Sequence, residues 1–408
     1  MTPPQSEPDR EPESGHRPEP DHHVARVRQD LPSLAGVTYL NSGTTGPLPR
    51  PVAEAVCETA LAHVLQPRTG RGHFDRAMQV KQDCRAALAG LLGCRPTEIA
   101  LTHNTTEGMN LITLGVNWVH GDEAITTNVE HPGALLPLWI VRDRYGVTVK
   151  TADLLSGPSD PVDAIIRLIT PRTKLISLSH VSYSTGDVLP LAQISAAAHE
   201  RGVLVLVDAA QAFGAMDVDM AALGVDFYSV SGQKWLCGPE GTGALYSAQN
   251  SISQIRTTFA GYGTVDGYND YGGFLVKEDG RRFEQGTMHL PDLAGMLAAV
   301  TWMTGIVGED WAHRRIHDLA ALARAELAKL DGVEVITGAT HAGLVSFSVG
   351  GLDPQDLVQR LADRSILVRG IPRPAAVRLS AGCFVTEDEL TAAVAAIGEE
   401  LAAMRHET

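Results

Sequence analysis

The sequence predicts an α/β protein, with a large domain built on a mostly parallel sheet and a smaller α+β domain at the C-terminus. Three observations favour this fold class. The chain has 408 residues, more than one ordinary core supports. Between about residues 50 and 290, apolar β-branched runs alternate with helical patterns, which is typical of crossover units. After about residue 295, a long helical stretch leads into a small αβ unit.

We divide the chain into four parts. Residues 1–30 are rich in Pro, Glu, Asp and His and have almost nothing to bury, so we expect a disordered tail. Residues 31–50 form an N-terminal segment, in which a short strand ends in a turn-rich stretch. Residues 51–290 form the large domain and residues 291–408 the small C-terminal domain.

Strands of the large domain are predicted from continuously apolar runs. The runs at 174–179 and 203–207 are separated by a helix-like stretch at 191–199. Strands in which apolar and polar residues do not alternate are expected where helices cover both faces of a sheet. Two further strand candidates lie at 226–230 and 242–246.

The small domain shows the same kinds of signal. Its predicted elements are a strand at 344–348, a helix at 354–363, a strand around 377–379 and a last helix. Thr386 and Glu389 have the spacing of a capping box at the start of that last helix.

Composition excludes several function classes. The net charge of -15 argues against a general affinity for nucleic acid or for an anionic membrane surface. The five cysteines are scattered and show no CxxC pair, so we expect neither a disulfide framework nor a metal site. No apolar run approaches the roughly 20 residues that span a bilayer, and the N-terminus lacks the apolar core of a signal peptide. We therefore predict a cytoplasmic protein.

Two residues at strand ends carry the first chemical signal. Ligands of an open parallel sheet bind beyond the carboxyl ends of the strands. Asp208 closes the run 203–207, and Lys234 follows the strand at 226–230 inside a turn of small residues. Alone, Asp208 could be a helix cap and Lys234 a surface lysine. Together they supply a carboxylate that keeps a pyridine nitrogen protonated and an amine that holds an aldehyde, which indicates pyridoxal 5'-phosphate.

The segments around these two residues resemble a known signature. Val207-Asp-Ala-Ala-Gln211 followed by Ser231-Gly-Gln-Lys234-Trp is similar to the signature of class V aminotransferases, which have fold type I. The family includes cysteine desulfurases, isopenicillin N epimerase-like proteins and cyst(e)ine C-S lyases. The resemblance runs from about Tyr39 to the C-terminus. It implies that pyridoxal 5'-phosphate is bound to Lys234 as an internal aldimine, and that an amino acid displaces Lys234 to form an external aldimine.

The resemblance also implies the residues that hold the cofactor. Asp208 pairs with the pyridine nitrogen, Gln211 approaches the phenolic oxygen and His131 stacks over the ring. The phosphate is held by a helix-start turn and by hydroxyl groups from both subunits of a homodimer with shared sites. These hydroxyls belong to Thr105, Thr106, Ser231 and the partner-directed Thr287. Taken singly, His131 could be a packed loop histidine and the turn only a helix cap.

Substrate contacts follow from the same resemblance. Arg378 would bind the substrate carboxylate with help from Arg369, and Asn41 would be a further substrate contact. A bidentate guanidinium suits a carboxylate better than an ammonium does. Two surface arginines are the alternative. Freed Lys234 would remove the Cα proton as general base, with Asp208 keeping the ring protonated.

The sequence departs from the family pattern at three places. Gln233 stands where many relatives have a His before the cofactor lysine, and it keeps a hydrogen bond but cannot titrate. Ser184 lies in a loop where many relatives have an Asn, so one ring contact is in doubt. The loop 369–375 contains no Cys, and Cys383 lies beyond Arg378. Sulfur transfer through an enzyme persulfide is therefore disfavoured.

Of the family's reactions, the sequence favours β-elimination from a cysteine-type amino acid. Four segments are similar to the cyst(e)ine lyase branch: Gly121-Asp-Glu, Glu130-His-Pro-Gly, Thr185-Gly-Asp-Val-Leu-Pro-Leu191 and Gly280-Arg-Arg-Phe-Glu284. An aminotransferase or an amino acid epimerase is the main alternative. A non-catalytic protein that binds the cofactor is a second. A nucleotide-binding protein is disfavoured because no GxGxxG or P-loop follows a predicted strand.

Overall fold

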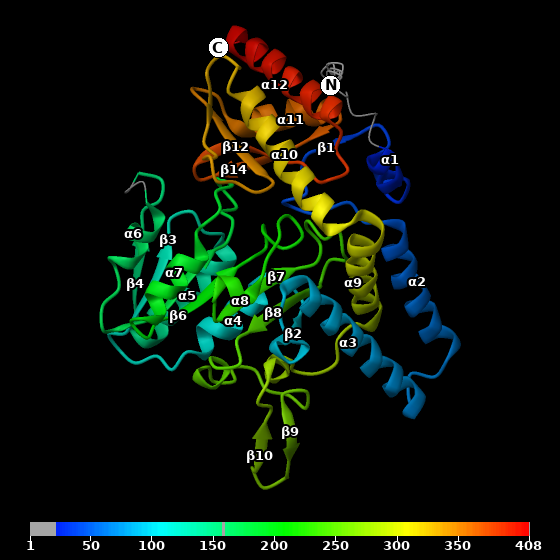
Figure 1. Ribbon diagram of the computed structural model, residues 1–408, viewed down its shortest axis with the longest axis vertical. Helices are drawn as coiled ribbons and strands as arrows, with labels where there is room; N and C mark the ends of the chain where they lie inside the picture. The colour runs from blue at the N-terminus through cyan, green and yellow to red at the C-terminus, as the bar shows by residue number, and fades with distance from the viewer. Residues whose placement is uncertain (1–21, 157–159, 408) are drawn as a thin grey trace, which may run out of the picture.

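The structure, a computed structural model, describes residues 22–156 and 160–407 of the chain (Figure 1). A seven-stranded sheet with helices around it forms the larger part, and a four-stranded sheet with long helices lies above it in this view. This arrangement confirms the predicted α/β fold with a large, mostly parallel sheet.

The seven-stranded sheet has the order β2-β8-β7-β6-β5-β3-β4. Its strands are β2 Ile99–Thr102, β3 Glu123–Thr127, β4 Thr148–Ala152, β5 Thr173–Ser179, β6 Leu204–Asp208, β7 Phe227–Ser231 and β8 Gly243–Ser247. Strands β7, β6, β5, β3 and β4 pair in parallel, whereas β8 runs antiparallel to both its neighbours. Five parallel strands therefore end at one edge, where the ligand site of such a sheet is expected.

Both faces of this sheet are buried, as the apolar runs predict. In β6, Val205 and Val207 belong to one apolar cluster, whereas Leu204 and Leu206 belong to the cluster on the other face. The helices around the sheet are α4 Thr105–Gly115, α5 Pro132–Tyr145, α6 Pro161–Ile166, α7 Leu191–His199 and α8 Met220–Leu223.

The N-terminal part differs from the expected tail. Residues 1–21 lie outside the described residues, but His22–Gln29 form helix α1, in which Val24 and Val27 are buried. Arg28 of this helix donates to Glu389 at 2.8 Å, so α1 is tied to the C-terminal part of the chain. The elements that follow are η1 Pro32–Leu34, β1 Thr38–Tyr39, α2 Arg50–Leu65, α3 Arg71–Leu92 and η2 Pro96–Glu98.

The C-terminal part contains the small sheet, with the order β11-β12-β15-β14 and antiparallel pairing throughout. Its elements are α10 Glu309–Leu327, β11 Val333–Val335, β12 Leu344–Val349, α11 Pro354–Asp363, β13 Ile366–Leu367, β14 Arg369–Pro372, β15 Ala375–Ser380 and α12 Glu387–Glu407. Thr386 and Glu389 exchange the two bonds of the predicted capping box. The stretch at 369–375, expected as a loop, is instead strand β14 and a tight turn into β15.

Helix α9 Leu290–Trp302 and the π-helical turn Met303–Val307 connect the two sheets. The stretch Leu290–Val307 is long and apolar enough, by length and composition, to cross a membrane, whereas no run of this kind is expected from the sequence. Half of it is buried, and α9 packs against α2 and α3 (Figure 1), which is also expected of a core helix.

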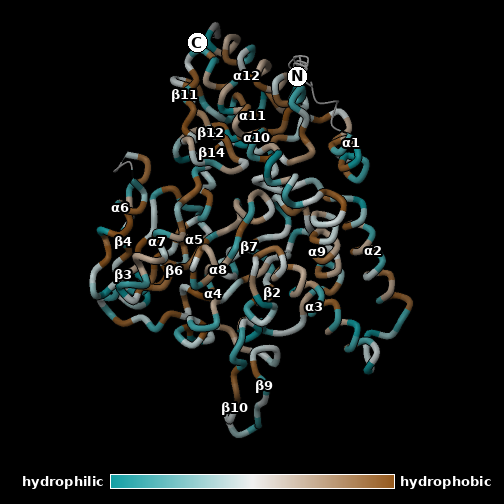
Figure 2. The backbone as a smooth tube through the Cα atoms, viewed as in Figure 1, coloured by the Kyte–Doolittle hydropathy of each residue, from teal (hydrophilic) through white to brown (hydrophobic). Residues whose placement is uncertain are grey.

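A hairpin of β9 Val265–Tyr268 and β10 Phe274–Val276 projects from the body of the protein (Figure 1). It follows η3 Ile252–Gln254 and precedes η4 Gly280–Phe283. Hydrophobic residues lie along this projection (Figure 2), and Tyr271 at its tip is 98% exposed. Such an exposed apolar projection is unusual for a surface that contacts only water.

Candidate active site

The carboxyl edge of the large sheet carries a row of polar side chains. Asp208 ends β6 and is paired with Ser179 of β5 on one side and with Ser229 of β7 on the other. It is 6% exposed, and its Oδ1 accepts a bond from the N–H of Ala210 at 3.0 Å. Asp208 takes part in none of the ion pairs among the described residues. A buried carboxylate that makes no direct ion pair fits a site built for a positively charged group.

Lys234 lies in the turn after β7, within the electrostatic reach of Asp208. Burial lowers the pKa of Lys234 to about 8, Asp208 acts to raise it and Arg378 to lower it. Gly46, in the N-terminal segment, stabilises this turn, because its N–H donates to the carbonyl of Gln233 at 2.7 Å. A Cβ at Gly46 would lie 2.2 Å from the carbonyl oxygen of Lys234, so only glycine fits there.

His131 lies at the start of α5, in the same group of charges. Burial lowers its pKa most, Asp208 raises it, and Lys234, Arg378 and Arg369 lower it. Its Nδ1 accepts a bond from the N–H of Gly133 at 3.1 Å. The neutral ring must then keep its hydrogen on Nε2, an assignment that follows from the hydrogen-bond network.

The predicted phosphate turn is built from α4 and β7. Asn104 caps α4 by accepting a bond from the N–H of Glu107 at 2.9 Å. Thr105 is buried and its hydroxyl donates to the hydroxyl of Ser231 at 3.0 Å, whereas Thr106 is exposed. These hydroxyls lie at a helix N-terminus, where backbone N–H groups and the helix dipole favour an anion.

Arg378 is the most deeply buried cation of the site. It is 3% exposed, and burial followed by the charge of Arg369 lowers its pKa to about 10. Nη1 donates to the carbonyl of Tyr183 at 2.8 Å and Nη2 to the hydroxyl of Thr44 at 3.2 Å. Nε has no partner among the described residues. An N–H edge of the guanidinium thus remains for an anion.

Three buried side-chain atoms around these residues lack a hydrogen-bond partner in the described part of the chain. They are Asn41 Oδ1, Gln233 Oε1 and Arg378 Nε. Buried polar atoms without a partner are costly, and a polar ligand bound at this site would satisfy these three. The residues present therefore fit pyridoxal 5'-phosphate and an amino acid.

Gln211 is committed to protein contacts on both ends of its amide. Its Nε2 donates to the carbonyl of Gly43 at 2.8 Å, and its Oε1 accepts from the indole N–H of Trp235 at 3.0 Å. One hydrogen of Nε2 stays available for the predicted contact to a phenolic oxygen.

Thr287 is the predicted residue that the fold does not bring into this group. It is exposed, and its hydroxyl lies 2.6 Å from that of Tyr262. Both line a surface groove of about 560 Å³. The groove also contains the cations Arg68 and Lys81 and three histidines, namely His63, His73 and His289.

Sequence reasoning missed two residues of the site. The ring of Tyr183 packs edge-on against His131, with 5.1 Å between the ring centroids, whereas the neighbouring Ser184 is fully buried against Ser182. Glu130 is 4% exposed and accepts bonds from the hydroxyls of Thr127 at 2.6 Å and Ser179 at 2.5 Å. A signal for Glu130 was present, since it directly precedes His131 in a segment already singled out.

The thiols show little of the reactivity that sulfur transfer needs. Cys383 is 3% exposed, and burial raises its pKa to about 12. Burial also raises the pKa of Cys237, in the turn after Lys234, well above its ordinary value. Since the thiolate is the nucleophile, neither group is activated. Cys57 is exposed but lies on α2, outside the site.

Comparison with known proteins matches this chain to one family. Residues 38–392 match the family model described as Aminotransferase class-V. A probable cysteine desulfurase of Methanothermobacter thermautotrophicus is 31% identical, over 82% of this chain and 84% of its own length. Isopenicillin N epimerase of Amycolatopsis lactamdurans is 32% identical, over 92% of this chain and 98% of its own length. A solved complex of the cystine C-S lyase C-DES with cysteine persulfide is 31% identical. The match covers 90% of this chain and 99% of that chain, with a TM-score of 0.86.

Proposed function

Because this chain belongs to the class V aminotransferase family, whose members are pyridoxal 5'-phosphate enzymes, we propose that it cleaves the C-S bond of a cysteine-type amino acid by β-elimination. The observation that carries the choice is the state of its thiols. A persulfide mechanism needs a reactive cysteine at the site, and Cys237 and Cys383 are buried thiols with raised pKa values. Elimination needs no enzyme thiol.

Cofactor binding is assigned to the residues of the carboxyl edge. Lys234 would hold the aldehyde, Asp208 the ring nitrogen and His131 one face of the ring. Gln211 and Gln233 would contact the remaining polar atoms of the cofactor. The phosphate would take its bonds from Thr105, Thr106 and Ser231, with the start of α4 adding a favourable dipole. When bound, the cofactor supplies a cationic ring that accepts the electron pair left at Cα.

The protein's own groups would orient the substrate and move one proton. Arg378 offers its open N–H edge to the carboxylate, and Asn41 Oδ1 can accept a bond from the substrate. The amine of Lys234 takes the Cα proton, which its pKa of about 8 favours near neutral pH. The β-sulfur leaves with its bonding electrons, and hydrolysis of the released enamine gives pyruvate and ammonia.

A homodimer with shared sites is part of this proposal. Thr287 is exposed and lines a surface groove together with Arg68 and Lys81, so it can face a phosphate of another subunit. The same side of the protein exposes apolar side chains of α2 and α3, namely Leu61, Val64, Leu65, Phe74 and Met78. Exposed apolar surface of this kind is typical of an interface.

Complementation tests the shared site. Subunits with Lys234→Ala and subunits with Thr287→Val are purified separately and then mixed under exchange conditions. A mixed dimer has one site with both residues intact, so activity should recover to a substantial fraction of the wild-type value. If the activity of the mixture equals the sum of the activities of the two separate variants, a site made from both subunits is rejected.

Product analysis tests the reaction. Holoenzyme is given cystine, cysteine and S-substituted cysteines, and pyruvate, ammonia and released thiol, persulfide or sulfide are quantified together. β-Elimination requires pyruvate and ammonia in equal amounts with a sulfur product, and no amino acceptor. Holoenzyme of Lys234→Ala serves as the control. A keto acid formed only in the presence of an acceptor, without sulfur release, would instead indicate transamination.

Epimerisation is the second candidate, favoured by the similarity to isopenicillin N epimerase over 92% of this chain. It requires proton return on the opposite face of Cα. Exchange of the Cα hydrogen in deuterium oxide, with inversion and without pyruvate, would establish it in place of elimination.

We place the protein in the cytoplasm. All five cysteines are free thiols, including the buried Cys237 and Cys383. Free thiols are typical of a reducing compartment.

A further inference from the structure

Tyr183 joins two groups of the site. It lies in the segment between β5 and α7, and its ring meets the ring of His131 edge-on, at an interplanar angle of 89°. Its backbone carbonyl accepts the bond from Nη1 of Arg378. The same residue therefore contacts the histidine assigned to the cofactor ring and the arginine assigned to the substrate.

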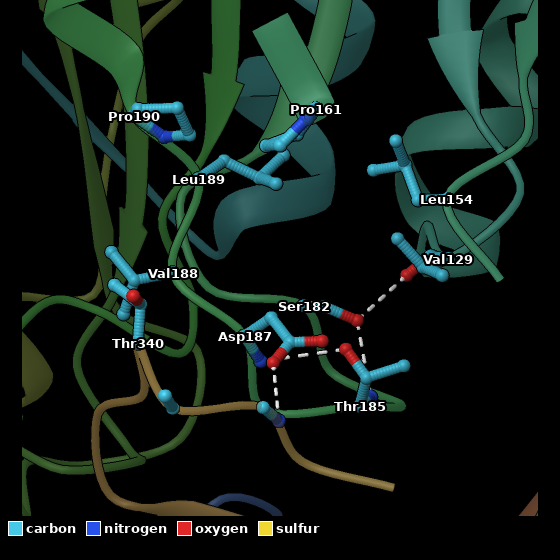
Figure 3. Close-up of a pocket in the computed structure, with 12 residues that line it drawn as sticks. Val129, Leu154, Pro161, Ser182, Thr185, Asp187, Val188, Leu189, Pro190 and Thr340 are labelled. Atoms are coloured by element: carbon cyan, nitrogen blue, oxygen red, sulfur yellow. Dashed lines mark hydrogen bonds between the residues drawn. The ribbon is translucent and has the colours of Figure 1, made fainter. Parts of the chain in front are cut away.

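The loop that holds Tyr183 is fixed on its other side (Figure 3). The hydroxyl of Ser182 donates to the carbonyl of Val129 and accepts from the N–H of Thr185 at 3.1 Å. Asp187 accepts a bond from the N–H of Gly338 at 2.7 Å, which ties the loop to the C-terminal part of the chain. A cavity of about 480 Å³ lies against this side of the loop, and Tyr183 is not among the residues that line it. The phenol is thus held toward His131.

The hydroxyl of Tyr183 is a free donor. It makes no hydrogen bond among the described residues, and the side chain is half-buried. Burial raises the pKa of Tyr183, Arg378 lowers it and Glu130 raises it. The phenol therefore keeps its proton at neutral pH. In turn, Tyr183 raises the pKa of Arg378, so the phenol oxygen and the guanidinium lie within electrostatic reach of each other.

We propose that the hydroxyl of Tyr183 donates a hydrogen bond to the carboxylate that Arg378 holds, and that it helps to select substrates with an α-carboxylate. The inference rests on the proposed function of Arg378. A carboxylate accepts about four hydrogen bonds, and the open edge of Arg378 supplies at most two. The half-buried phenol of Tyr183, whose backbone carbonyl already binds Arg378, can supply a third from a rigid aromatic group that needs little ordering.

Substitution by phenylalanine tests this contact. Tyr183→Phe removes one hydroxyl but leaves the ring on His131 and the carbonyl bond to Arg378. Glycine, which cannot undergo elimination, is titrated into holoenzyme and its binding is followed by the visible absorbance of the cofactor. We expect the dissociation constant to rise roughly tenfold or more, as expected for a hydrogen bond to a charged group. The absorbance without glycine should stay unchanged.

Cysteamine tests whether the effect of Tyr183→Phe depends on the carboxylate of the ligand. This amine lacks a carboxylate, so Tyr183→Phe should bind it as the wild type does. Tyr145→Phe, on the far end of α5, is the matched control and should bind both ligands normally. Unchanged glycine binding in Tyr183→Phe would overturn the proposal, as would an equal loss for glycine and cysteamine. Because glycine binding is read without turnover, the result stands even if the elimination reaction itself is not observed.

Discussion

Arg378 and Arg369 face each other across the β14–β15 hairpin, yet only Arg378 is buried. Arg369 is exposed, while Arg378 donates two hydrogen bonds to the protein and keeps Nε free. Two like charges on paired residues destabilise each other, most strongly where water is excluded. The buried guanidinium of Arg378, next to a second positive charge, is therefore stabilised when the carboxylate of a substrate binds to it.

Replacement of Arg378 should weaken substrate binding more than replacement of Arg369. Arg378→Lys removes the flat N–H edge but keeps the charge, and we expect KM to rise roughly 10- to 100-fold. Arg369→Lys, exposed and outside the hydrogen-bond network, should change KM by only a few-fold. Steady-state kinetics on one cysteine-type substrate compare the two. Equal effects at both positions would contradict the assignment of the carboxylate to Arg378.

Capture of the cofactor should depend on pH through Lys234. Burial, the largest cause, lowers the pKa of this amine to about 8. The neutral amine is the form that reacts with an aldehyde, so the rate of reconstitution from apoprotein should rise about tenfold per pH unit below the midpoint and level off above it. Stopped-flow absorbance measures this rate between pH 6 and 10. A rate that still rises steeply at the upper end would show an unperturbed amine.

Glu130 should make the apoprotein less stable as the pH rises. Burial raises its pKa to about 7 from 4.5, bonds from Ser179 and Thr127 lower it, and Asp208 raises it. The folded state holds this proton more tightly than the unfolded state. Its stabilising effect is therefore complete below pH 4.5 and is lost as the pH rises through 7, by on the order of 3 kcal/mol.

Glu130→Gln replaces the titrating carboxyl group by an amide and so removes its contribution to the pH dependence of stability. The free energy of unfolding of the variant, relative to that of the wild type, should increase between pH 5 and pH 8. Denaturant unfolding at both pH values measures the difference. Glu54→Gln, on the exposed side of α2, is the control. A relative stability that is the same at both pH values would show that Glu130 does not titrate in this range.

The buried ion pair of Arg85 and Glu284 should stabilise the segment that leads to Thr287. The two side chains are 7% and 9% exposed and 2.6 Å apart, and Glu284 also accepts a bond from the N–H of Leu101. Removing one partner leaves a buried charge, so Arg85→Met or Glu284→Gln should each lower the free energy of unfolding by about 3–5 kcal/mol. The double variant should lose clearly less than the sum. Additive losses would show that the two residues act independently.

The sequence predicted those parts of the fold that depend on local pattern. Val203–Val207 reads as a strand buried on both faces because side chains alternate between two apolar clusters, and Asp208 follows where such a strand must end. The N-terminal helix α1 was missed because its two buried valines stand in a polar stretch and find their partners only in the folded chain. Tertiary contacts, not local propensity, stabilise such a helix.

Motif resemblance predicted a set of site residues, but it did not show which neighbour faces the site. Between Tyr183 and Ser184, only the loop geometry distinguishes the residue that packs on His131 from the one that packs on Ser182. Likewise, the partners of Glu130 lie on β3 and β5, which are far apart in the sequence and adjacent in the sheet. Such contacts depend on strand order, which the sequence alone does not state.

The identity of the cofactor lysine is tested most directly by covalent capture. Holoenzyme is reduced with borohydride, digested, and its peptides are examined by mass spectrometry. The proposed site requires a pyridoxyl group on the peptide that contains Lys234, and its absence from that peptide in Lys234→Ala. A label on a different lysine, or no stable label in protein that contains the cofactor, would contradict the assignment.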